Sequence, residues 1–119
     1  MSNKELGKVG ETKAARFLVH QGYQILEKNY RFRLGEIDIV AQYKSQLIFV
    51  EVKTRRSRVF SGLLSIDDNK QRKIVSTAEH YQMTKKMIDW QPRFDIICVY
   101  FEKGEWDFEH FPNSFSIFY

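Results

Sequence analysis

The amino-acid sequence predicts a mixed α/β domain in which helices flank a sheet of about five strands, in the order αβββαββ. Two segments carry apolar residues at helical spacing, and five shorter segments are rich in β-branched or aromatic residues. Turn-forming residues separate these segments. The length of 119 residues leaves room for one core, so residues 1–119 are expected to form one domain.

The first predicted element is a helix over residues 3–21. Asn3 can cap its start, and Gly22 suits its end. Its apolar stripe consists of Leu6, Val9, Phe17 and Leu18. From residue 23 the period changes, which indicates an extended stretch to residue 32 with an interruption around 28–29.

Residues 35–42 and 47–54 are the clearest strand predictions, because both are rich in β-branched residues. The four residues between them are expected to close a hairpin with a two-residue turn at Lys44 and Ser45. Side chains alternate between the faces of a strand, so one face of this hairpin is wholly apolar and must be buried. That face consists of Ile37, Ile39, Ala41, Ile48, Val50 and Val52.

The other face of the hairpin carries charges at the end far from the turn. In the predicted register Asp38 lies opposite Glu51, and Glu36 lies opposite Lys53. Two facing carboxylates repel, so a purely structural sheet would favour opposite charges there. A divalent cation would remove the conflict, because Mg²⁺ binds one or two carboxylates together with water and phosphate oxygens. The alternative is a solvated sheet face with a weak Glu36–Lys53 ion pair.

Glu11 could bring a third carboxylate to this region. It lies on the first predicted helix among small or apolar neighbours, which would allow the helix to approach the sheet closely. The alternative is a partly exposed acid that pairs with Lys8 or Lys13.

The second half of the chain is expected to alternate between helix and strand. Its predicted elements are a basic loop over 55–66, a helix from about 67 to about 86, a strand over 93–101, a turn at 103–104 and a last strand over 105–111.

Composition excludes several classes of protein. No apolar run approaches the roughly 18 residues that a membrane span needs. Cys98 is the single cysteine, so a disulfide framework is excluded and a cytoplasmic location is the expectation. The formal charge of +4 allows an anionic partner such as a nucleic acid.

The run GEIDIVA followed by FVEVKTR, preceded by Gly10-Glu11 on the first helix, resembles the YraN-like family of predicted endonucleases. It also resembles, more distantly, the archaeal Holliday-junction resolvases and the wider PD-(D/E)xK nuclease superfamily. The resemblance covers nearly the whole chain and implies a restriction-endonuclease-like fold. Ile37 stands where the superfamily name has Pro, which is usual in this branch.

Carried over by position, the resemblance implies that Asp38 and Glu51 bind metal and that Lys53 assists catalysis. It also implies that Glu11 completes the acidic cluster. Two accessory positions match the family more loosely: Glu36 and Gln71.

The resulting hypothesis is Mg²⁺- or Mn²⁺-dependent hydrolysis of phosphodiester bonds in DNA, including branched or junction DNA. Six basic side chains could contact the flanking phosphates, which fixes position without reading sequence. They are Arg55, Arg56, Arg58, Lys70, Arg72 and Lys73. The sequence leaves the oligomeric state open; analogy with the resolvases, which act as dimers, allows a homodimer.

Three alternatives remain open from the sequence. The fold could be a nucleic-acid-binding module without turnover, or an RNA endonuclease. It could also be an interaction domain whose aromatic tail, FPNSFSIFY, docks on a partner, although packing of that tail on its own domain is favoured.

Overall fold

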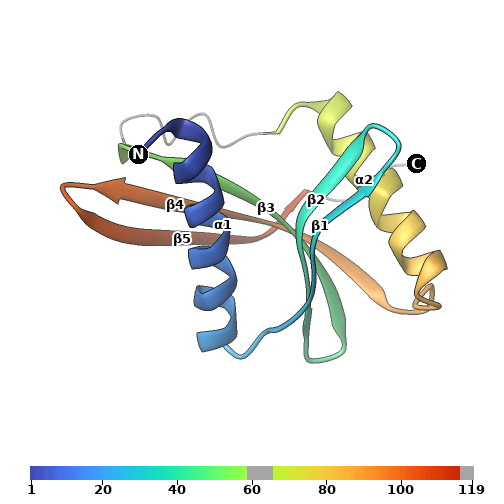
Figure 1. Cartoon of the computed structure of the whole chain (residues 1–119). Coiled ribbons are helices and arrows are strands. Elements are labelled where there is room, and N and C mark those ends of the chain that lie inside the picture. Colours follow the sequence, from blue (N-terminus) through green and yellow to red (C-terminus); the bar gives the residue numbers. More distant parts are fainter. Residues whose placement is uncertain (59–65, 116–119) are drawn as a thin grey trace.

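The computed structural model describes residues 1–58 and 66–115, and the αβββαββ order is confirmed. All five strands form one sheet in the order β1-β2-β3-β4-β5, in which only the β3–β4 pair is parallel. The elements are α1 (Asn3–His20), β1 (Gln24–Phe32), β2 (Gly35–Tyr43), β3 (Gln46–Arg55), α2 (Asp68–Thr84), β4 (Gln91–Glu102) and β5 (Glu105–Phe115) (Figure 1).

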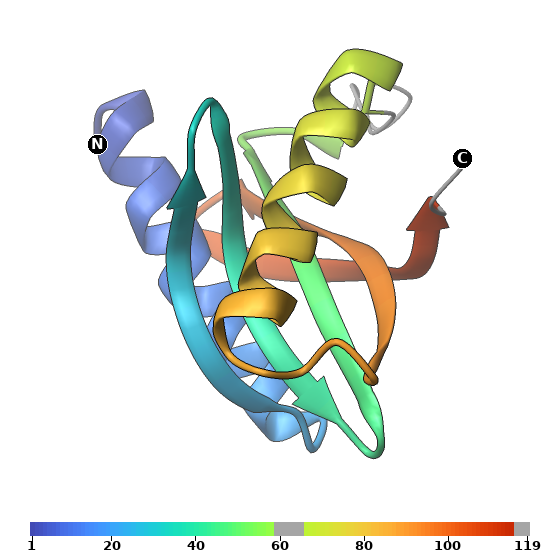
Figure 2. The same cartoon turned by 90° about the vertical axis from the view of Figure 1, so that its right-hand side faces the viewer.

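The two helices cover opposite faces of the sheet (Figure 2). Each face has its own apolar cluster. The α2 side includes Ile74, Ala78, Tyr81, Val40, Phe49, Phe94 and Cys98. The α1 side includes Ala14, Leu18, Ile39, Ala41, Ile48, Val50, Ile97 and Val99. The sheet is therefore the buried middle layer of three layers.

Side chains just before the first helical residue cap both helices. The Ser2 hydroxyl accepts a hydrogen bond from the Glu5 amide at 3.1 Å, and the Glu5 carboxylate accepts one from the Ser2 amide at 3.5 Å. This capping box places the cap one residue before the predicted Asn3. At α2, Asp67 accepts a hydrogen bond from the Lys70 amide at 2.8 Å, at the start of the helix predicted from about residue 67.

The predicted turn between β2 and β3 is confirmed. Tyr43 pairs with Gln46, and Lys44 takes a left-handed conformation with φ 55°. The ladder follows the predicted register as far as the pair of Ile39 with Val50, where pairing ends. The hairpin is therefore regular near its turn and open at its far end.

The charged end of this hairpin differs from the prediction. Within the described strands, Asp38 and Glu51 are not ladder partners, and neither are Glu36 and Lys53. The physical reason is that the Asp38 carboxylate itself accepts the Val52 amide hydrogen at 2.8 Å. The Asp38 side chain thus accepts a hydrogen bond from a backbone N–H group of β3.

The alternation of side chains also breaks at Asp38. Ile37 packs in the α2-side cluster with Val40, whereas strict alternation places it with Ile39 on the α1 side. The prediction that Ile37 shares a face with Ile39 is therefore wrong, although Ile37 is buried as predicted. The break leaves the Asp38 carboxylate beside α1.

Several other predictions can be compared with the fold. Cys98 is fully buried as a core residue. The aromatic tail begins to pack on its own domain, because the Phe115 ring stacks on Phe94 at 5.0 Å. Residues 59–65 of the predicted basic loop and residues 116–119 of the tail lie outside the described residues. Among the described helices, none is long and apolar enough to cross a membrane.

Candidate functional site

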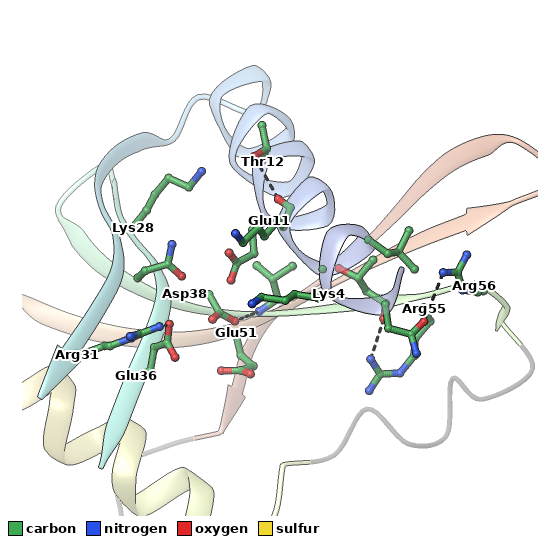
Figure 3. A pocket seen from close by; sticks show the side chains of 17 residues that line it. Lys4, Glu11, Thr12, Lys28, Arg31, Glu36, Asp38, Glu51, Arg55 and Arg56 are labelled. Carbon is green, nitrogen blue, oxygen red and sulfur yellow. Dashed lines mark hydrogen bonds and ion pairs between the residues drawn. The ribbon is translucent and has the colours of Figure 1, made fainter. Parts of the chain in front are cut away.

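A cleft of about 910 Å³ lies between the first three turns of α1 and the open end of the β2–β3 hairpin (Figure 3). Its acidic lining residues are Glu11, Glu36, Asp38 and Glu51. Its basic lining residues are Lys4, Lys8, Lys28, Arg31, Arg55 and Arg56. The structure thus brings carboxylates from α1, β2 and β3 to one acid centre, defined here as Glu11, Asp38 and Glu51.

Gly10 explains how Glu11 reaches the sheet. Gly10 is buried, and a Cβ atom on it would lie 2.0 Å from Thr54 Oγ1 on β3. Only a residue without a side chain allows α1 to pack this closely. The close approach positions the next residue, Glu11, over the end of β2.

Asp38 has the most perturbed carboxyl group of the acid centre. Burial and the negative charge of Glu51 raise its pKa to about 8, and Glu11 adds to the rise through its charge and a hydrogen bond that favours protonated Asp38. The hydrogen bond from the Val52 amide opposes the shift. A carboxyl group among two other acids therefore holds a proton at neutral pH.

Glu51 contacts α2 through an ion pair. Lys70 Nζ lies 3.0 Å from Glu51 Oε1, and the Glu51 side chain is only 12% exposed. The Asp67 cap fixes the first turn of α2, which carries Lys70. The structure therefore places Lys70 at the acid centre, where it pairs with a carboxylate.

Lys53 lies two residues beyond Glu51 on β3 and is half-buried beside Cys98 of β4. Burial lowers its pKa, the positive charges of Lys70 and Arg55 lower it further, and the charge of Glu51 opposes them. Lys53 is not among the residues that line the cleft. Its predicted catalytic role stays a prediction.

The two accessory positions have structural partners. Glu36 lies 3.4 Å from Arg31 Nε across the β1–β2 hairpin, and both side chains are exposed, so the pair contributes little. The Gln71 amide donates a hydrogen bond to the Ile66 carbonyl at 2.7 Å and so holds the segment that leads into α2.

The predicted phosphate-contacting residues fall into different environments. Arg58 is held on β5 by ion pairs with Asp107 and Glu109. Arg56 donates to the Met1 carbonyl at 2.7 Å and borders the cleft. Arg55 also borders the cleft, whereas Arg72 and Lys73 are exposed on α2.

Four basic residues of the cleft were missed by sequence reasoning: Lys4, Lys8, Lys28 and Arg31. Lys4 and Lys8 lie one turn apart on the helix face that leads to Glu11. That spacing is a signal that could have found them. The two β1 residues carried no comparable signal.

Comparison with known proteins places the chain in a family. A family model described as uncharacterised protein family UPF0102 matches residues 10–99. The chain belongs to the UPF0102 family. A UPF0102 protein of Caldanaerobacter subterraneus subsp. tengcongensis is 47% identical over 120 residues, which cover 97% of this chain and 98% of the relative. One of Dictyoglomus thermophilum is 44% identical over 118 residues, which cover 97% and 100%.

The match to the UPF0102 family includes the acid centre, Lys53 and Lys70. It begins at Gly10, the residue that allows α1 to approach β3. The family description gives no activity, so chemistry has to be argued from the site itself.

The acid centre of this UPF0102 chain offers the kind of ligand atoms that a hard divalent cation prefers. Its side-chain donors are carboxylate oxygens, and burial together with the negative charges of Glu51 and Glu11 raises the pKa of Asp38. In residues 1–58 and 66–115, however, no three side chains of His, Cys, Asp or Glu are grouped so that they could hold a metal ion. Glu51 pairs with Lys70 instead.

A further buried acid, Asp95 on β4, has a structural role. It accepts hydrogen bonds from Arg93 at 2.7 and 2.9 Å, from the Asn113 amide at 2.9 Å and from His110 at 2.7 Å. Burial would raise its pKa, but these partners hold it below its usual range. Asp95 is thus fully satisfied, as a buried carboxylate in a core must be.

Proposed function

We propose that this UPF0102 protein is a divalent-metal-dependent endonuclease that hydrolyses phosphodiester bonds in DNA. The observation that carries the proposal is the acid centre, in which three carboxylates from three elements lie in one cleft edged by six basic side chains. A fold that only needed stability would gain nothing from this repulsion.

Asp38 and Glu51, together with Glu11, would hold Mg²⁺ or Mn²⁺. A bound divalent ion polarises the phosphoryl oxygen and lowers the pKa of a bound water. Lys53, whose pKa is lowered by burial, is the residue that would position the attacking water or take its proton. Lys70 would supply positive charge next to Glu51.

The basic edges of the cleft support a nucleic-acid substrate. Lys4 and Lys8 extend from α1, and Lys28 and Arg31 from β1, so positive charge lies on both sides of the acid centre. Both helices begin at this end of the molecule, which adds the positive ends of their dipoles (Figures 1 and 2). Such contacts bind phosphates without reading sequence.

The test is a cleavage panel with the full-length protein. Duplex, nicked, flap and four-way-junction DNA, with matched RNA strands, are incubated in Mg²⁺, Mn²⁺ or EDTA. We expect metal-dependent cleavage of at least one DNA, loss of cleavage in Asp38→Ala and Lys53→Ala, and retention in Arg58→Ala. The Arg58 variant is the matched control because Arg58 is held on β5. Equal cleavage by the parent, Asp38→Ala and Lys53→Ala would refute the site, and RNA-only cleavage would refute DNA as the substrate.

One observation favours a second candidate, a nucleic-acid-binding protein without turnover. The Lys70–Glu51 ion pair neutralises one carboxylate of the acid centre from within the chain. This candidate predicts DNA binding that weakens steeply with salt and no cleavage of any substrate in the panel. The same panel, read alongside a binding titration, separates the two candidates.

A further inference from the structure

The tip of the β1–β2 hairpin presents an apolar side chain to solvent. Arg33 takes a left-handed conformation with φ 54°, and the next residue, Leu34, is 86% exposed. No other large apolar side chain in the described part of the chain is as exposed. A single exposed leucine is ordinary on a protein surface, so its surroundings have to decide whether it has a role.

The hairpin that carries Leu34 is braced against α2. A Cβ atom on Gly35 would lie 2.0 Å from Thr77 Oγ1 and 2.7 Å from the Lys73 carbonyl oxygen, so the backbone directly after the tip is pressed onto the helix. On the strand before it, the Phe32 ring stacks on His80 at 3.6 Å. The tip is therefore held in place while Leu34 projects, which lowers the entropic cost of inserting it into a ligand.

The braced tip borders the acid centre. Leu34 lines a notch of about 160 Å³ together with Asp38, Glu51 and Lys70. Figure 2 shows the hairpin tip at the same end of the molecule as the first turns of both helices. A phosphate at the acid centre would thus place neighbouring bases within reach of Leu34.

Basic side chains lie on both sides of the tip, next to the carboxylates of the notch. Arg31 lies near the end of β1 and Arg33 in the turn, and Lys70 and Lys73 line the notch on the α2 side. The notch is also lined by Glu36, Asp38 and Glu51. An apolar side chain next to basic residues, beside the site proposed for a phosphodiester, is the arrangement of a wedge that enters a base stack.

We propose that Leu34 inserts between bases at a break in duplex DNA and so selects nicked or branched DNA over continuous duplex. The proposal rests on the proposed function, because it needs DNA at the acid centre. Unstacking costs least where a nick or branch has already interrupted the stack, and this difference would produce the selectivity.

The experiment uses the full-length protein in EDTA, so that binding is measured without turnover. The probe is a nicked DNA duplex with 2-aminopurine next to the nick, and the intact duplex is the comparison. Fluorescence of 2-aminopurine reports unstacking, and anisotropy of an end label reports affinity. The variants are Leu34→Ala and Leu34→Phe, and the control is Ile88→Ala, which removes another exposed apolar side chain, 70% exposed.

We expect the wild type and Leu34→Phe to raise 2-aminopurine fluorescence on the nicked duplex. Leu34→Ala should lose this rise and the preference for nicked over intact DNA, on the order of tenfold, while Ile88→Ala behaves as the wild type. An equal rise with Leu34→Ala, or an equal loss with Ile88→Ala, would overturn the wedge while leaving the nuclease proposal intact. A change in sedimenting mass with Leu34→Ala, without a change in fluorescence, would show that the tip contacts protein instead. Absence of binding by the wild type to either duplex in EDTA would overturn the wedge, whereas the nuclease proposal is decided by the cleavage panel in Mg²⁺ or Mn²⁺.

Discussion

Replacing Asp38 by Asn is expected to stabilise the fold, and increasingly so as the pH rises. Asn keeps a carbonyl oxygen that can accept the hydrogen bond of the Val52 amide, which lies 2.8 Å from the Asp38 carboxylate. It cannot become negatively charged beside Glu51 and Glu11. The substitution therefore removes the repulsion and keeps the hydrogen bond.

The sign and size of the effect follow from the pKa of Asp38. Folding raises this pKa from 3.8 to about 8, so between these values the folded protein keeps a proton that the unfolded chain releases. The free energy of unfolding therefore falls as the pH rises from about 4 to about 8, and the loss is complete above that. At about 1.4 kcal/mol for each pKa unit, the shift sets an upper limit of about 5–6 kcal/mol. Because this upper limit ignores relaxation and solvent around the buried carboxyl, we expect the advantage of Asn to grow by about 1–3 kcal/mol between pH 5 and pH 8.

Urea unfolding in EDTA, followed by tryptophan fluorescence at several pH values, measures this difference directly. Other titrating groups cancel in the comparison of the two proteins. Glu36→Gln is the matched control, because it also replaces a carboxylate by an amide on β2, at a side chain that is exposed and paired with Arg31. An advantage of Asn that stays constant from pH 5 to pH 8 would refute a pKa of Asp38 raised by burial and by the charges of Glu51 and Glu11.

Four further measurements address the fold and the site. Asp95→Asn should lower the free energy of unfolding by about 3 kcal/mol or more, because it leaves buried donors imperfectly paired; urea unfolding measures it. Gly10→Ala should lower the melting temperature, because its Cβ would clash with β3 at a cost of about 1–3 kcal/mol. Lys28→Ala should reduce the salt slope of DNA binding by about one, whereas Arg58→Ala should not; anisotropy across salt concentrations measures it. Mg²⁺ should raise the melting temperature of the wild type more than that of Asp38→Asn.

Each of these expectations can fail in a defined way. Wild-type stability in Asp95→Asn would mean that its hydrogen bonds contribute little. An unchanged melting temperature in Gly10→Ala would mean that α1 can move away from β3. Equal salt slopes for Lys28→Ala and the wild type would show that Lys28, and with it this edge of the cleft, does not contact DNA phosphates. Equal Mg²⁺ shifts with and without the Asp38 carboxylate would place the ion elsewhere.

The parts of the fold that sequence predicted correctly depend on local signals. Asp67 caps α2 through its own side chain, and the turn at Lys44 forms between two β-branched runs. Both signals lie within a few residues of the structure that they determine. The end of the β2–β3 ladder could not be predicted in this way, because it depends on a hydrogen bond from Val52 to a side chain on another strand.

The same distinction applies to the candidate site. Asp38 and Glu51 belong to one recognisable hairpin motif, so their proximity could be inferred even though the two residues are not ladder partners. Lys28 of β1 lines the same cleft as the first turns of α1, and this proximity depends on a tertiary contact that the sequence does not show. The pairing of Lys70 with Glu51 likewise depends on where α2 docks.

The parallel pairing of β3 with β4 has a consequence for the order of folding. Along this pair Val50 lies beside Asp95, about 45 residues further along the chain, whereas the β1–β2, β2–β3 and β4–β5 pairs are closed by short turns. Joining distant segments has an entropic cost that local hairpins avoid, so we expect this step to limit the folding rate. The acid centre lies entirely within the segment that ends at β3, so a nascent chain would contain all three of its carboxylates before the strand that completes the sheet has been synthesised.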